Sequence, residues 1–139
     1  MGKTRSELRE KAMVILYQVD ILKNQKVDFT IENLISENLE VDNEFVRNIV
    51  YGVITHIESL DELANKYMNK WTIDRIDKTG AAILRIGLYE MLYEEETPNV
   101  VAINEAIELA KKKGALKRAL EVDEIPESIY EELKTYVVE

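Results

Sequence analysis

The sequence predicts an all-α protein, and three observations support this prediction. Leu, Ile, Glu, Lys and Ala dominate a chain of 139 residues that contains only five glycines and two prolines, a composition that favours helices. Hydrophobic residues make up 46% of the chain, enough to bury a real core. Long apolar patterns follow the period of a helix, and strand-like alternation is absent. We therefore expect one compact domain over residues 1–139, built from about six to eight helices.

The first half of the chain predicts three helices. Apolar residues at helical spacing, with Ser6 as N-cap, predict a helix over residues 6–23. After a polar loop, a shorter helix is expected over residues 30–39, with the threonine at its start as the cap. Over residues 42–57 the apolar residues cover two adjoining stripes, so this helix should pack against neighbours on more than one side. Gly52 would permit a close helix crossing.

The second half predicts a buried central helix. A helix that begins near Ser59 leads to a connector, and residues 76–92 are then apolar nearly all round, so they should form a helix covered on most sides. Pro98 marks a boundary, because proline fits the first turn of a helix and disfavours continuation of the preceding one. The next helix should end at Gly114, and a last helix is expected to begin near Pro126.

The polar residues within the apolar helices predict packing rather than catalysis. Arg85 and Glu90 lie in the central helix, where isolated charges need partners, so each is interpreted as an internal pairing group. The single histidine, His56, is interpreted as a partly buried packing residue. The sequence contains no cysteine, no metal-ligand spacing, no nucleophile motif and no glycine-rich phosphate loop. We therefore expect a protein that is not an enzyme and uses no metal or cofactor.

Hydropathy indicates where the protein works. No stretch approaches the roughly 20 apolar residues of a membrane span, and the charged N-terminus lacks the apolar core of a signal peptide. The absence of cysteine fits a reducing compartment. We expect a cytoplasmic protein with no membrane association.

A first basic patch lies at the N-terminus, although the net charge of the chain is −9. Arg5 and Arg9 are four residues apart, so they should share one face of the first helix, and Lys3 precedes them. The fork geometry of arginine suits phosphate, which favours RNA contact by these three residues. A frayed, charged chain terminus is the ordinary alternative.

A second basic patch runs over residues 111–118 and contains five cations and no acid. We expect Lys113, Lys117 and Arg118 to bind RNA on the same side as the first patch, because phosphates follow a continuous groove better than two separated patches. A favourable interaction of lysines with a helix C-terminus is the ordinary alternative.

Tyr17 is the candidate residue for contact with a protein partner. It lies at the edge of the buried stripe of the first helix, next to the core residue Leu16. A boundary packing role and a role as partner anchor both stay open for its amphipathic ring.

Several segments, in order along the chain, form a pattern that a known family shares: Arg9–Ala12, Leu16–Asp20, Phe45–His56, Ile83–Glu90 and Pro98–Lys111. The most distinctive block is the run INEAIELAK at residues 103–111. These segments resemble the NusB family of transcription antitermination factors, and the similarity covers about residues 5–114.

The resemblance implies a fold and a role. It implies an all-α fold of two helical subdomains. It also implies binding of the boxA element of nascent, single-stranded RNA as a heterodimer with the ribosomal protein NusE, within the transcription elongation complex, in support of ribosomal RNA transcription. Of the site residues, it implies an RNA contact most directly for Arg9 and then for Arg5. A homodimer is left open.

This chain departs from the family pattern at both ends. The family often has a denser arginine run at the N-terminus, so the cationic edge here is thinner. After Gly114 the family usually continues with a Phe-Val-Asn-Gly-Val-Leu motif near the RNA, and residues 115–139 lack it. Either the last helices differ, or this chain binds RNA through residues 111–118.

Two alternative functions remain at this stage. A similar domain forms the RNA-binding part of certain ribosomal RNA methyltransferases, but 139 residues leave no room for their catalytic domain. The other alternative is a helical protein–protein interaction module that does not bind RNA.

Overall fold

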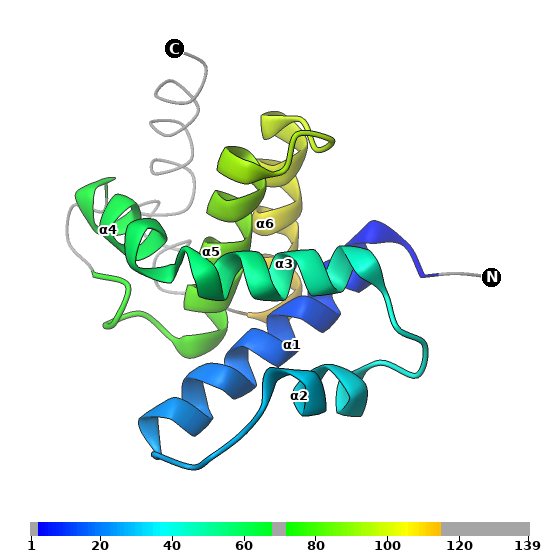
Figure 1. Ribbon diagram of the computed structural model, residues 1–139. Helices are drawn as coiled ribbons and strands as arrows, with labels where there is room; N and C mark the ends of the chain where they lie inside the picture. Colours follow the sequence, from blue (N-terminus) through cyan, green and yellow to red (C-terminus); the bar gives the residue numbers. More distant parts are fainter. Residues whose placement is uncertain (1–2, 68–71, 115–139) are drawn as a thin grey trace.

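Six α-helices make up the part of the chain that the computed structural model describes, which is residues 3–67 and 72–114 (Figure 1). None of these residues lies in a β-strand. The helices are α1 (Arg5–Asn24), α2 (Ile31–Asn38), α3 (Glu44–Thr55), α4 (Ile57–Tyr67), α5 (Lys78–Tyr93) and α6 (Asn99–Lys113). The helix expected near Pro126 lies outside the described residues.

The start of α1 differs from the sequence prediction. Its N-cap is Thr4 rather than Ser6, and Thr4 forms a capping box with Glu7: the Thr4 hydroxyl accepts from the Glu7 N–H, and the Glu7 carboxylate accepts from the Thr4 N–H. Ser6 instead donates to Glu105 of α6 over 2.8 Å. Either residue type can cap a helix, and the glutamate three positions after Thr4 completes the box.

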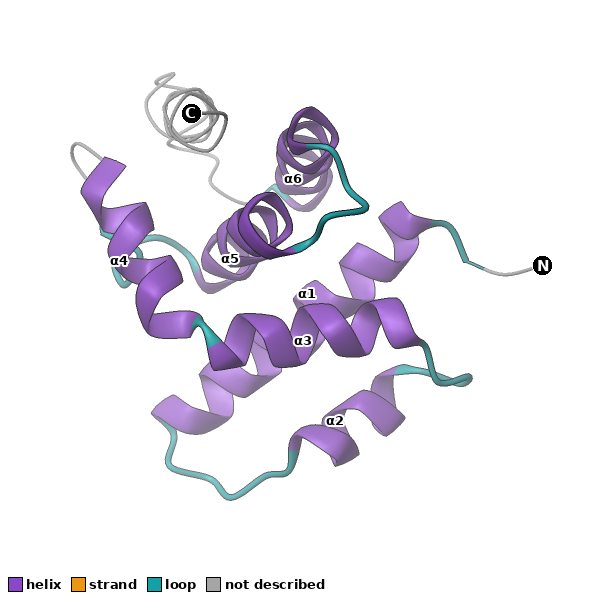
Figure 2. Cartoon of the chain, turned by 45° about the horizontal axis from the view of Figure 1, so that its top comes forward, coloured by secondary structure: helices purple, strands orange, loops and turns teal. Residues whose placement is uncertain are grey.

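The helix α5 lies at the centre of the fold, as predicted. It packs against α1, α3, α4 and α6, while α2 packs against α1 (Figure 2). Burial of each large aliphatic side chain here stabilises the fold by about 1.5–3 kcal/mol. The largest aliphatic side chains that are fully buried come from five of the helices: Ile15, Ile35, Ile49, Leu60, Ile83, Leu84 and Leu88.

His56 joins α3 to α4 rather than lying within one helix. It is the C-cap of α3, its N–H donates to the Gly52 carbonyl, and α4 begins one residue later, at Ile57. Its ring is half-buried and stacks on Tyr93, with 4.0 Å between ring centroids. The predicted packing role of His56 is confirmed, and its partner is the last residue of α5.

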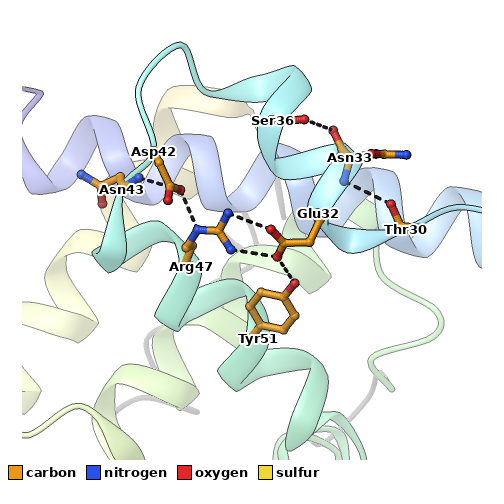
Figure 3. Close-up of polar contacts among 8 residues, drawn as sticks. All are labelled: Thr30, Glu32, Asn33, Ser36, Asp42, Asn43, Arg47 and Tyr51. Carbon is orange, nitrogen blue, oxygen red and sulfur yellow. Dashed lines mark hydrogen bonds and ion pairs between the residues drawn. The ribbon is translucent and has the colours of Figure 1, made fainter.

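A polar cluster on the surface joins α2 to α3 (Figure 3). The Arg47 guanidinium donates to both carboxylate oxygens of Glu32, each over 2.8 Å, and to Asp42 over 2.6 Å. The Tyr51 hydroxyl donates to the same Glu32 carboxylate. The cluster orients α2 against α3. It contributes only modest stability, because these side chains are exposed to solvent.

None of the helices in the described part combines the length and apolar character that a membrane span requires.

We predict that replacing Gly52 destabilises the crossing of α3 and α5. A Cβ atom at this position would overlap the Tyr89 ring, so Gly52→Ala should lower the free energy of unfolding by about 1–3 kcal/mol. Urea denaturation measures this loss. Thr55→Ala, at an exposed position of α3, should stay within about 0.5 kcal/mol of the wild type. An unchanged free energy of unfolding in Gly52→Ala would contradict the prediction and show that the Tyr89 ring moves aside without cost.

We predict that the stabilising contribution of the Glu32 carboxylate is lost in acid. Hydrogen bonds from Arg47 and then Tyr51 lower the pKa of Glu32 from 4.5 to about 2. A lowered folded-state pKa contributes stability that is complete above pH 4.5 and is lost as the pH falls towards 2. Between these pH values Glu32→Gln should therefore lose stability less steeply than the wild type, as thermal melts can measure. Glu37→Gln, an exposed change in the same helix, should follow the wild type. Parallel curves for all three proteins would contradict the prediction.

Candidate nucleic-acid interface

A buried ion pair holds the N-terminal half of α1 against α5. Arg9 is only 5% exposed, and its guanidinium donates to both oxygens of Glu90, over 2.7 and 2.8 Å. Glu105 of α6 lies 3.8 Å from the same guanidinium, and the Phe45 ring centroid lies 5.4 Å from it. Arg9 is therefore occupied by carboxylates of the same chain.

The prediction that Arg9 shares an exposed cationic edge with Arg5 is wrong. Position 9 falls on the side of α1 that α5 and α6 cover, whereas the Arg5 side chain is 52% exposed. The spacing of four residues placed both on nearly the same side of the helix, but it did not show that neighbouring helices cover only one of them. Arg9 orients α1, and an RNA phosphate cannot reach its guanidinium in this arrangement.

The pairing roles predicted for the two charges of α5 are confirmed. Glu90 is the partner of Arg9 and is 1% exposed. Arg85 donates to both oxygens of Asp61 in α4, over 2.8 and 2.9 Å, and lies 3.8 Å from Asp20 of α1. Both charged groups of the central helix thus link it to neighbouring helices.

The exposed cations at the start of α1 are Lys3 and Arg5. The Arg5 guanidinium lies 4.2 Å from the Phe45 ring centroid and 3.8 Å from the Glu96 carboxylate. The Lys3 ammonium lies 4.0 Å from Glu7. Both groups are half-exposed, so an external phosphate can reach them, although each already faces a carboxylate.

Arg5 also lines an open groove of about 660 Å³ between the start of α1, the start of α3 and the loop after α5. The residues that line it are Arg5, Leu8, Asn43, Glu44, Phe45, Asn48, Tyr93, Glu94, Glu95 and Glu96. Four of them are glutamates and one is a cation, so the field inside the groove disfavours phosphate. RNA that contacts Arg5 should therefore approach from outside the groove.

The C-terminal end of α6 brings part of the second basic patch to α1. The helix ends at Gly114, whose φ of 62° is the left-handed conformation that glycine adopts easily, as predicted. The Lys112 and Lys113 ammonium groups lie 2.7 and 3.2 Å from the two oxygens of Glu10 in α1. The ammonium groups of Lys112 and then Lys113 lower the pKa of Glu10 despite its partial burial.

The two basic patches both border the first half of α1, but they do not form a continuous positive stripe within the described residues. Glu96 faces Arg5 at one end, and Glu10 joins Lys112 and Lys113 at the other. Lys117 and Arg118 lie outside the described residues. The placement of the whole second patch beside the first stays a prediction.

Tyr17 is 38% exposed, next to the buried Leu16. This exposure is compatible with a boundary packing role and with a partner contact, so the partner-binding role stays a prediction.

The sequence did not predict which carboxylates form ion pairs with these cations. Glu10 pairs with Lys112, Glu96 with Arg5, and Glu105 with the buried Arg9. The first two glutamates come from charged runs that look like ordinary solvated surface. Their partners lie far away along the chain, so no local spacing could reveal them. Within the described ranges, no three acidic or histidine side chains are grouped to hold a metal ion.

Comparison with known proteins agrees with this architecture. The NusB family model matches residues 6–119. A curated relative from Bacillus cereus (strain B4264), named transcription antitermination protein NusB, is 42% identical over 110 residues, which are 79% of this chain and 84% of the relative. A relative of the same name from Bacillus anthracis (strain CDC 684 / NRRL 3495) matches to the same extent.

Solved structures show the same fold. T. maritima NusB superposes with a TM-score of 0.77 at 27% identity, over 95% of this chain and 94% of that chain. The structure described as antitermination factors NusB and NusE in complex with dsRNA has a TM-score of 0.73 at 23% identity, over 94% of this chain and 98% of that chain. The prediction of an all-α fold of this type is confirmed.

We predict that loss of Arg9 is strongly destabilising because it leaves the buried Glu90 carboxylate without its cation. Arg9→Met should lower the free energy of unfolding by about 3–5 kcal/mol. The double variant Arg9→Met/Glu90→Leu should recover most of this loss, since no charge is then buried alone. Arg5→Met, at the half-exposed position, should cost less than about 1 kcal/mol. Urea denaturation of the wild type and these three variants measures the free energies of unfolding. Equal losses in Arg9→Met and Arg5→Met would contradict the prediction.

Proposed function

The chain belongs to the NusB family, and from this premise we propose that it binds boxA-type single-stranded RNA together with the ribosomal protein NusE. The observation that carries the proposal is the family match over residues 6–119, together with 42% identity to relatives named as transcription antitermination proteins. Antitermination is the role of this family, and it requires no enzymatic step. Action within the transcription elongation complex is part of the same proposal.

The partners are proposed from the family and from the likeness to a complex. A protein of the same fold is described in complex with NusE and dsRNA, which supports NusE and an RNA as the partners here. The boxA sequence and the single-stranded form of the RNA rest on the resemblance of the motifs. Tyr17 is the proposed contact for the protein partner, because its ring is partly exposed beside the core of α1.

The proposed RNA surface consists of the accessible cations around the first half of α1. Lys3 and Arg5 supply one end, and Lys113 supplies the other, with Lys117 and Arg118 following it in sequence. A protein of net charge −9 needs such a local positive field to attract phosphate. Arg9 serves this surface indirectly, because its pair with Glu90 holds α1 in place.

We predict that Lys3→Ala/Arg5→Ala weakens RNA binding to the same degree for boxA-type and scrambled single-stranded oligonucleotides, because phosphate contacts carry no sequence information. Each lost contact should also reduce the slope of log affinity against log salt by about 0.7. Fluorescence anisotropy at several salt concentrations, with and without NusE, measures both effects.

Arg75→Ala provides the matched control, because Arg75 is an exposed cation in the connector before α5. It should change neither affinity nor slope beyond the effect of net charge. Unchanged binding by the double variant would place the RNA site elsewhere. Binding of NusE without any RNA binding would instead favour a protein–protein interaction module.

A further inference from the structure

One carboxylate, that of Glu10, contacts the ammonium groups of two of the three lysines in the last turn of α6, Lys112 and Lys113. Lys112 Nζ lies 2.7 Å from Glu10 Oε1, and Lys113 Nζ lies 3.2 Å from Oε2. Glu10 Oε1 is inaccessible to solvent, and the side chain as a whole is 25% exposed. Each oxygen of the Glu10 carboxylate in α1 thus contacts one lysine of α6.

We propose that Glu10 is an internal competitor of RNA phosphate for Lys112 and Lys113, and that it lowers the intrinsic RNA affinity of this surface. This inference rests on the proposed RNA-binding function and adds a control element to it. Glu10 sets how much of the positive charge of the second basic patch is available to a phosphate.

The geometry allows the competition. The Lys112 side chain is 64% exposed, so its ammonium is open to solvent on the side away from Glu10. An ammonium has three donors, which leaves some of them free for an external acceptor. A phosphate oxygen at hydrogen-bond distance on that side would lie about 5–6 Å from the Glu10 carboxylate. Two like charges would then share one cation.

Competition explains the arrangement better than preorganisation does. Lysines in the last turn of a helix are already favoured by the partial negative charge of its carbonyl groups, so they need no carboxylate to hold them there. Glu10 adds a negative charge on the other side of the ammonium to which a phosphate would bind. At a separation of about 5–6 Å in a solvent-exposed setting, this repulsion corresponds to about a threefold to tenfold loss of affinity.

The consequence is a greater dependence of RNA binding on the protein partner. Phosphate contacts bind any RNA sequence, and a carboxylate that shares their cations weakens such contacts for every sequence alike. The ratio of affinities for different RNA sequences is then unchanged, but binding needs the additional contacts that the protein partner supplies. A lower intrinsic affinity therefore increases the dependence of RNA binding on the partner.

The test compares Glu10→Gln with the full-length wild type by anisotropy titration of boxA-type and scrambled single-stranded RNA without NusE. We expect about threefold to tenfold tighter binding of both RNAs by Glu10→Gln. The salt slope should steepen by up to about 0.7 for each lysine that is released. Glu10→Ala should show the same gain, and circular dichroism melts check that both variants retain the helical fold.

Two controls isolate the mechanism. Glu62→Gln, at an exposed position of α4, makes the same change in net charge and should give a much smaller gain. In a Lys112→Gln/Lys113→Gln background, Glu10→Gln should give no gain, because the cations for which it competes are gone.

Three outcomes overturn the inference and leave the proposed function standing. Equal gains in RNA affinity from Glu10→Gln and Glu62→Gln would show that the gain comes from the change in net charge alone. Weaker binding by Glu10→Gln would show that the carboxylate positions the lysines for RNA. A gain that persists without the two lysines would show that Glu10 weakens RNA binding without acting through these cations. Failure of every variant to bind either RNA, in the presence of NusE as well, would overturn the proposed function itself, and the inference with it.

Discussion

The buried pair of Arg9 and Glu90 is the constraint on which the arrangement of α1 depends. Among the described residues, neither charge has an alternative partner that is held at two hydrogen bonds, and an unpaired charge at this depth would cost several kcal/mol. The first half of α1 must therefore lie where Arg9 reaches α5 and Glu105 of α6. Once it lies there, Arg5 rests on Phe45, and Glu10 meets the end of α6.

This constraint also decides which cations an external ligand can reach. The best-oriented guanidinium of the N-terminal patch is used inside the protein, and Lys3, Arg5 and the three lysines of the last turn of α6 remain at the surface. Four of these cations, Lys3, Arg5, Lys112 and Lys113, each face a carboxylate of the same chain. A phosphate that binds one of these four cations shares it with a carboxylate that is already in contact, so the net free energy of binding is smaller than the count of cations suggests.

The same helices separate surfaces of opposite charge. The groove beside Arg5 is lined by Glu44 and by Glu94–Glu96, whereas the last turn of α6 carries three consecutive lysines. Screening in physiological salt acts over about 8 Å, so neighbouring surfaces of a small domain can keep distinct local fields. A strongly acidic protein can in this way offer phosphate a limited area and disfavour it elsewhere.

The sequence by itself determined the all-α fold, the central place of α5 and the family, because the helical period and the motifs are local properties of the chain. It also showed that Arg85 and Glu90 needed partners. Only the tertiary structure decided which partners they have: Arg9 and Glu90 are 81 residues apart. The helical period gives the direction of a side chain around its own helix axis. It does not say which neighbouring helix covers that direction, so burial turned Arg9 from an expected RNA contact into an internal support.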